Sequence, residues 1–127
     1  MSIKYDVSHD GFRIDTLPEG ILDIKETADY FNRMKNDERI KQGAIEVVNF
    51  KHVTDFNISY VESEKITKIY QEPKNNRLID QTVFVCETDL AYGIGRMLQA
   101  FHEITNPKHK VTVVRSESEL EKIGKTV

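Results

Sequence analysis

The chain has 127 residues, of which 39% are hydrophobic and 31% charged, and a formal net charge of -3 at pH 7. Its length is close to the modal size of one domain, so we expect a single domain over residues 1–127, and the net negative charge with scattered Lys and Arg argues against nucleic-acid binding. No apolar run approaches the roughly 18 residues of a membrane span, the first residues lack a signal peptide's apolar core, and the single Cys86 excludes an internal disulfide, so we expect a cytoplasmic protein.

Alternating apolar residues at the amino end predict a β-hairpin. The stretches "IKYDVSH" and "FRIDTL" form its strands, with residues 9–11 at the turn. A capping box of Asp23 and Glu26 predicts a first helix that runs to about Asp37. The run "GAIEVVNF", nearly all apolar and rich in β-branched residues, predicts a central strand covered on both faces.

The second half of the chain repeats the alternation of helices and strands. Ser59 and Glu62 form a second capping box, ahead of a helix that Pro73 ends. "TVFVC" and "KVTVV" are predicted strands, "DLAYGIGRMLQAFHEI" is a predicted helix and "SESELEKIG" a short terminal helix. The order β-β-α-β-α-β-α-β-α predicts an α/β fold with a five-stranded mixed sheet and helices on both faces. We expect the last three strands to be parallel and the hairpin to form an antiparallel edge.

This order of elements resembles the SpoIIAA-like fold of STAS domains. The resemblance is carried by the hairpin, the three β-α units and the stretch "VVNFKHVTDFNIS" that leads into the second helix. The stretches "DLAYGIGRM" and "VTVVRSESEL" are similar, more narrowly, to bacterial STAS-like proteins of that superfamily. The resemblance implies a non-enzymatic domain that binds a protein partner or a second copy of itself.

One motif of the resembled family is altered in this chain. In the sporulation anti-sigma-factor antagonists, an Asp-Ser-Ser/Ala-Gly motif after the third strand carries the phosphorylated serine that controls partner binding. The matching stretch here reads Asn57-Ile58-Ser59-Tyr60, so Ile58 stands at the phosphoacceptor position. We interpret Ser59 instead as the N-cap of the second helix.

The helix after Cys86 contains two glycines, each of which costs roughly 1 kcal/mol relative to alanine in a helix interior. Helix amino ends meet at the carboxyl edge of a parallel sheet, where open α/β folds bind ligands. The side chains expected at this edge are His52, Asp55, Asn57, Ser59, Glu87, Thr88, Asp89, Arg96, Arg115 and Ser116. Free backbone N–H groups and glycines that permit close approach predict a site for a small anion. Its candidate residues are Ser59, Thr88, Tyr92, Gly93, Gly95 and Arg96.

Packing offers a second explanation of the glycines. Glycine lets a helix lie close to a sheet, and Asp89 beside the predicted site repels anions. On this hypothesis an apolar stripe at helical spacing seats the helix on the sheet, and an added methyl group at Gly93 overpacks the interface. The stripe consists of Leu90, Ile94, Met97, Leu98, Phe101 and Ile104.

Other chemistries find little support in the sequence. There is no P-loop and no G-x-G-x-x-G fingerprint, and His102 and His109 lack the spacing of a zinc helix, so we expect no cofactor and no metal. An enzyme using Cys86, or using the carboxylates of Glu87 and Asp89, lacks a visibly placed base. We therefore expect no catalytic activity.

The alternative function is a carrier of a small apolar or amphipathic, lipid-like ligand. It is implied by the superfamily's resemblance to CRAL-TRIO lipid-transfer domains, with Arg96 binding the head group of the ligand. A carrier needs a lined pocket of about 300 Å³ or more. An interaction domain needs an exposed apolar patch instead. The size of an internal cavity therefore separates the two functions.

Overall fold

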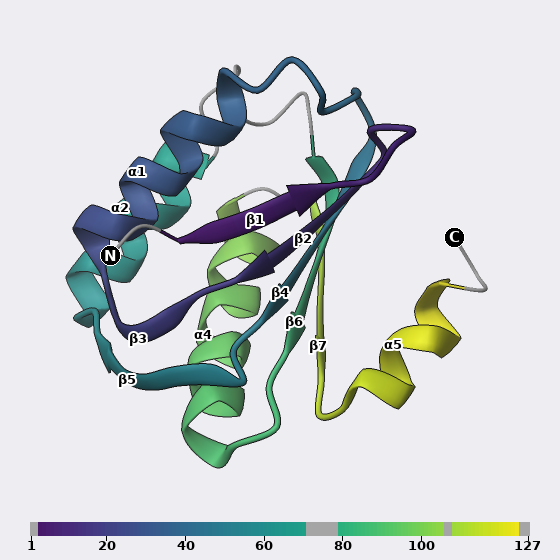
Figure 1. Cartoon of the computed structure of the whole chain (residues 1–127). Helices are drawn as coiled ribbons and strands as arrows, with labels where there is room; N and C mark the ends of the chain where they lie inside the picture. The colour runs from purple at the N-terminus through teal and green to yellow at the C-terminus, as the bar shows by residue number, and fades with distance from the viewer. Residues whose placement is uncertain (1–2, 71–78, 106–107, 125–127) are drawn as a thin grey trace.

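The computed structural model of the chain describes residues 3–70, 79–105 and 108–124. Its main feature is a five-stranded sheet in the order β1-β2-β4-β6-β7 (Figure 1). The strands are β1 (Lys4–Val7), β2 (Arg13–Leu17), β4 (Ala44–Asn49), β6 (Ile79–Val85) and β7 (Lys110–Val114). β1 pairs antiparallel with β2, and the other neighbouring pairs are parallel. The predicted mixed sheet with an antiparallel edge is therefore confirmed.

Helices cover both faces of this sheet, as predicted. Among the described residues, the earlier helices lie on one face and the last helix lies on the other face (Figure 1). They are α1 (Ile24–Lys35), α2 (Tyr60–Tyr70) and α4 (Asp89–Thr105), opposite α5 (Glu117–Gly124). The larger core cluster lies under the first three helices and includes Phe31, Phe50 and Phe84. On the other face, Leu120 of α5 packs against valines of β4, β6 and β7.

The structure corrects the predicted order of elements, because it contains two strands that the sequence patterns do not reveal. β3 (Glu19–Asp23) and β5 (His52–Asn57) pair in parallel as a separate two-stranded sheet. β5 leaves four of its six residues exposed, so it lacks the apolar alternation that marks a half-buried strand. The order of the described elements is β-β-β-α-β-β-α-β-α-β-α.

Side-chain caps begin the first two helices as the sequence predicts. At α1 the Asp23 carboxylate accepts a hydrogen bond from the Glu26 N–H at 2.9 Å. At α2 the Ser59 hydroxyl accepts from the Glu62 N–H at 3.1 Å, and the Glu62 carboxylate accepts from the Ser59 N–H at 3.0 Å. This reciprocal pair confirms the capping box. Pro73, predicted to end α2, lies outside the described residues.

None of the helices within residues 3–70, 79–105 and 108–124 combines the length and the apolar composition needed to cross a bilayer.

Candidate functional site

The amino end of α4 brings together several of the predicted site residues. The Thr88 hydroxyl caps the helix by accepting a hydrogen bond from the Ala91 N–H at 3.1 Å. The Arg115 guanidinium lies 4.6 Å from the centroid of the Tyr92 ring and donates to the Asp89 carboxylate at 2.9 Å. Arg115, which follows β7, is therefore the cation held at this helix end.

Two other predicted residues have different surroundings. Arg96 is exposed and lies eight residues after Thr88, which is about 12 Å along the helix axis. Ser59 is held in the capping box of α2. Asp89, exposed and paired with Arg115, places a carboxylate where an anion has to approach. Anion binding at this end stays a prediction, and the contacts do not favour it.

The two glycines of α4 have different neighbours. A Cβ atom built on Gly95 lies 2.9 Å from Cys86 Sγ and 3.3 Å from Val113 Cγ1, so the helix is close to the sheet at this point. A Cβ atom built on Gly93 meets no atom within 4 Å. The packing explanation therefore holds for Gly95, and its assignment to Gly93 is wrong.

We expect Gly95→Ala to be less stable than Gly93→Ala by about 1–3 kcal/mol, the usual cost of overpacking. Both variants gain about the same helix propensity, roughly 1 kcal/mol, so the difference between them isolates the packing cost. Urea denaturation measures this difference. Adding Cys86→Ala to Gly95→Ala should restore part of the loss, because it removes the nearest atom. Equal stabilities of the two single variants contradict this assignment.

The face of α4 that meets the sheet coincides only in part with the predicted stripe. Four residues at helical spacing are buried or packed against the core on that face: Ala91, Gly95, Leu98 and His102. Leu90 is 53% exposed and Ile104 is 79% exposed, and the Tyr60 ring of α2 packs against Phe101 with 5.2 Å between centroids. Ile94 faces the interior, where it lines the same cavity as Leu98 and His102. We call the apolar residues on the outward side the α4 stripe, made of Leu90, Met97, Phe101 and Ile104.

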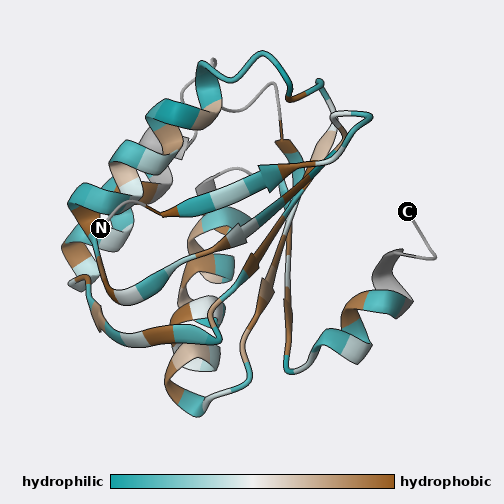
Figure 2. Ribbon diagram, viewed as in Figure 1, coloured by the Kyte–Doolittle hydropathy of each residue, from teal (hydrophilic) through white to brown (hydrophobic). Residues whose placement is uncertain are grey.

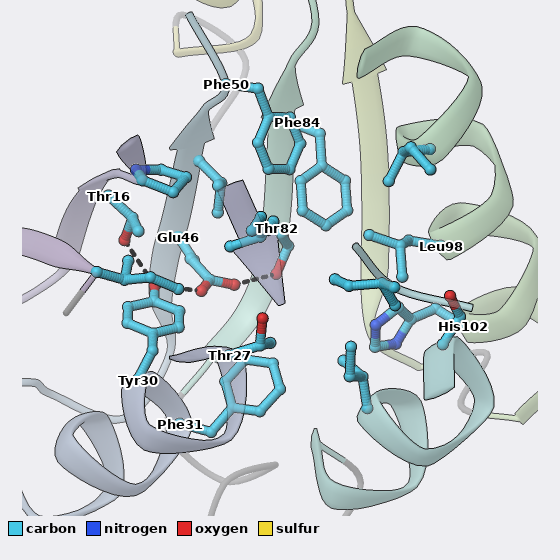
Figure 3. Close-up of a pocket in the computed structure, with 18 residues that line it drawn as sticks. Thr16, Thr27, Tyr30, Phe31, Glu46, Phe50, Thr82, Phe84, Leu98 and His102 are labelled. Carbon is cyan, nitrogen blue, oxygen red and sulfur yellow. Dashed lines mark hydrogen bonds between the residues drawn. The ribbon is translucent and has the colours of Figure 1, made fainter. Parts of the chain in front are cut away.

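A cavity of about 70 Å³ lies between the main sheet and helices α1, α2 and α4 (Figure 3). Much of its wall is apolar and includes the rings of Phe31, Phe50 and Phe84. Polar side chains also line it, namely Thr16, Thr27, Tyr30, Glu46, Ser63, Thr82 and His102. The volume is well below the roughly 300 Å³ expected of a carrier. This cavity therefore does not support the lipid-like ligand.

Glu46 of β4 is buried in the wall of the cavity, with 2% of its surface exposed. The Tyr30 hydroxyl donates to Glu46 Oε2 at 2.5 Å, and the Thr82 hydroxyl contacts Oε1 at 2.8 Å (Figure 3). The Thr16 hydroxyl lies 2.6 Å from the Tyr30 oxygen, and His109 Nε2 lies 2.8 Å from the Thr82 oxygen. One buried chain of hydrogen bonds thus joins α1 to β2, β4, β6 and the start of β7.

A second histidine, His102 of α4, lies beside this chain. The centroids of the His102 and His109 rings are 5.2 Å apart. Burial, and to a lesser extent the neighbouring His109, lower the pKa of His102 to about 4. His102 is therefore uncharged at neutral pH.

The candidates for catalysis and metal binding lie in settings that disfavour those roles. Burial raises the pKa of Cys86 to about 12, so its thiol stays protonated and is a poor nucleophile. The carboxylate of Asp89 is engaged by Arg115. Within the part of the chain that the structure describes, no group of three or more His, Cys, Asp or Glu side chains is arranged to hold a metal ion.

Sequence reasoning does not identify the buried chain of hydrogen bonds. The available signal is Glu46, a single charged residue inside the otherwise apolar run "AIEVV". A charged group in a buried strand requires hydrogen-bonding partners, so this position predicts a polar contact without saying which residues make it. The two histidines give no such signal, because their separation in sequence does not show that their rings lie together.

Comparison with known proteins identifies the fold. No family model and no curated protein matches the sequence. An uncharacterized Shewanella loihica protein of the DUF3478 family, with a SpoIIAA-like fold, matches with a TM-score of 0.58 and 8% identity, covering 95% of this chain and 90% of that one. The anti-sigma factor antagonist SpoIIAA, in its unphosphorylated form, matches with a TM-score of 0.51 and 6% identity, covering 99% of this chain and 100% of that one. The chain therefore has a SpoIIAA-like fold.

Proposed function

We propose that this chain is a non-enzymatic, cytoplasmic binding domain that engages a protein partner through the α4 stripe and the adjoining start of α2. The exposed apolar surface carries this proposal, because Tyr60 and Leu90 are more than half exposed and Ile104 is 79% exposed. Figure 2 shows apolar residues along α4 and at the start of α2. Exposed apolar surface marks interaction sites, and aromatic side chains are enriched at interfaces.

The SpoIIAA-like fold supports a regulatory binding role. One of the matching structures is that of an anti-sigma factor antagonist in its unphosphorylated form. In this chain Ile58, at the position that matches the phosphoacceptor, packs against the core cluster, and the Ser59 hydroxyl is engaged as the N-cap. The proposed partner binding therefore does not depend on phosphorylation at this position.

Affinity capture with matched surface variants tests the proposal. The tagged protein is incubated with lysate of its own host, and retained proteins are quantified for wild type, Ile104→Glu and Phe12→Glu. Ile104 lies on the α4 stripe, whereas Phe12, 50% exposed in the hairpin, is the matched control elsewhere on the surface. A charge buried within an apolar contact is costly, so Ile104→Glu should lose a partner that Phe12→Glu retains.

Two results decide the outcome. Sedimentation velocity on the same variants identifies the partner as a second copy if wild type and Phe12→Glu dimerise and Ile104→Glu does not. Retention of every captured protein by Ile104→Glu, together with an unchanged oligomeric state, contradicts a binding role for the α4 stripe.

A further inference from the structure

Two buried side chains, Glu46 and His109, contact the hydroxyl of Thr82, which carries one proton. Its oxygen lies 2.8 Å from Glu46 Oε1 on one side and 2.8 Å from His109 Nε2 on the other. The remaining ring nitrogen, His109 Nδ1, lies 3.0 Å from the carbonyl oxygen of Ile79. Because a carbonyl oxygen only accepts, Nδ1 carries a proton and Nε2 is left as the atom whose protonation varies.

The two hydrogen bonds of Thr82, to Glu46 and to His109, need one proton more than the Thr82 hydroxyl supplies. If Glu46 is ionised and His109 neutral, both Oε1 and Nε2 are acceptors, and the single Thr82 proton serves one of them. The other contact then sets two lone pairs against each other at 2.8 Å inside the protein. A proton on Oε1 lets Glu46 donate to Thr82 and Thr82 donate to Nε2. A proton on Nε2 reverses both bonds. We propose that Glu46 and His109 together hold one buried proton, shared through the Thr82 hydroxyl.

The surroundings decide which end of the chain carries this proton. Tyr30 from α1 donates to Glu46 Oε2, and His102 from α4 faces His109 as a neighbouring ring. Burial lowers the pKa of His109, while its contact with the Ile79 carbonyl and the charge of Asp80 at the start of β6 act in the opposite direction. Separated charges in this setting carry a desolvation cost, whereas donation from Tyr30 and Thr82 to the two Glu46 oxygens favours the carboxylate. Both arrangements hold the same single proton.

The shared proton couples folding to pH. Above pH 7 the unfolded chain has an ionised glutamate and a mostly neutral histidine, whereas the folded chain holds the proton. The folded state then binds one proton more than the unfolded state, so stability falls as pH rises. The folding equilibrium constant should drop about tenfold per pH unit from about pH 7 to 8.5. The stability of the core therefore decreases at alkaline pH, through the buried hydrogen bonds that join α1 to the sheet.

Urea denaturation between pH 6 and 8.5 tests the proposal in three proteins. Wild type should show the tenfold slope. Glu46→Gln should be nearly flat from pH 7 to about 8, because its amide N–H₂ donates to Thr82 without a titrating proton and its amide oxygen accepts from Tyr30. Towards pH 8.5 the buried Cys86 thiol, whose pKa is raised, lowers the stability of all three proteins alike, so the test is the difference between their slopes. Glu87→Gln, which changes an exposed carboxylate, is the control and should keep the wild-type slope. A wild-type slope equal to that of Glu46→Gln overturns the proposal.

A second measurement uses the wild type alone and covers the case in which Glu46→Gln does not fold. Refolding from urea at pH 7.8 in weakly buffered solution with a pH indicator reports proton uptake directly. We expect an uptake approaching one proton per chain. An uptake near zero overturns the shared proton regardless of how the variant behaves. Both measurements are independent of the α4 stripe, so the proposed partner binding stands or fails separately.

Discussion

Replacing Tyr30 with phenylalanine should lower the free energy of unfolding by about 2–3 kcal/mol. The Tyr30 hydroxyl donates to Glu46 Oε2 at 2.5 Å and lies 2.6 Å from the Thr16 hydroxyl. Both of these partners are buried, with at most 3% of their surface exposed. Removing the hydroxyl leaves a buried acceptor and a buried hydroxyl without this partner, and each such loss is costly because water does not replace it.

A nearby tyrosine provides the matched control for this change. The Tyr5 ring packs edge-to-face with Tyr30 at 5.7 Å, but its hydroxyl donates to the partly exposed Asp37 at 2.8 Å. Asp37 is also engaged by Arg39, so Tyr5→Phe leaves it with a partner and should cost about 1 kcal/mol or less. Chemical denaturation at pH 7 compares the two variants. A Tyr30→Phe cost no larger than that of Tyr5→Phe refutes the structural role assigned to the buried chain.

The free energy of unfolding should also fall by about 3 kcal/mol between pH 6.5 and pH 4 because of His102 alone. Burial lowers the pKa of His102 to about 4 in the folded chain, against about 6.5 in the unfolded chain. Between these values the unfolded state binds a proton and the folded state does not, so stability rises with pH across the window. The contribution is complete above about pH 6.5 and is lost as pH falls towards 4.

The difference between wild type and His102→Leu isolates this effect from the carboxylates that also titrate in acid. His102→Leu replaces the ring with an apolar side chain and should reduce the loss of stability between pH 6.5 and 4 by most of this amount. His9→Gln changes an exposed histidine in the hairpin and should leave the wild-type pH profile intact. Parallel pH profiles of wild type and His102→Leu are the outcome that rules out the neutral buried imidazole.

Most of the main architecture could be predicted from local sequence patterns. β4, β6 and β7 are apolar runs of β-branched residues, and α1 and α2 begin at capping boxes whose bonds the structure contains. β3 and β5 could not be predicted in the same way. They pair with each other outside the main sheet, and β5, with four of its six residues exposed, has no strong apolar period.

The predicted rotation of α4 is right for Ile94 and Leu98 but wrong for Leu90 and Ile104, for a physical reason. The stripe of Leu90 and Ile104 is the more apolar face of the helix, so hydrophobicity alone directs it towards the sheet. The structure instead turns Ala91 and Gly95 inward, where small side chains let the helix backbone approach Cys86. Close packing favours the small face, and the apolar face is left for solvent or a partner.

The buried chain of hydrogen bonds depends on contacts between distant parts of the sequence. Glu46, Thr82 and His109 meet because β4, β6 and β7 are neighbours in the parallel sheet, and Tyr30 reaches them from α1. A single charged residue in an apolar strand predicts that partners exist. Their identity depends on strand order and register, which local patterns do not specify.

Native mass spectrometry of the purified protein tests most directly whether the domain acts through its surface. The cavity of about 70 Å³ is too small for a lipid-like ligand, so the spectrum should show the polypeptide mass, or an integer multiple of it, without a co-purified small molecule. A stoichiometric extra mass that is released on denaturation would contradict this account and identify the protein as a carrier.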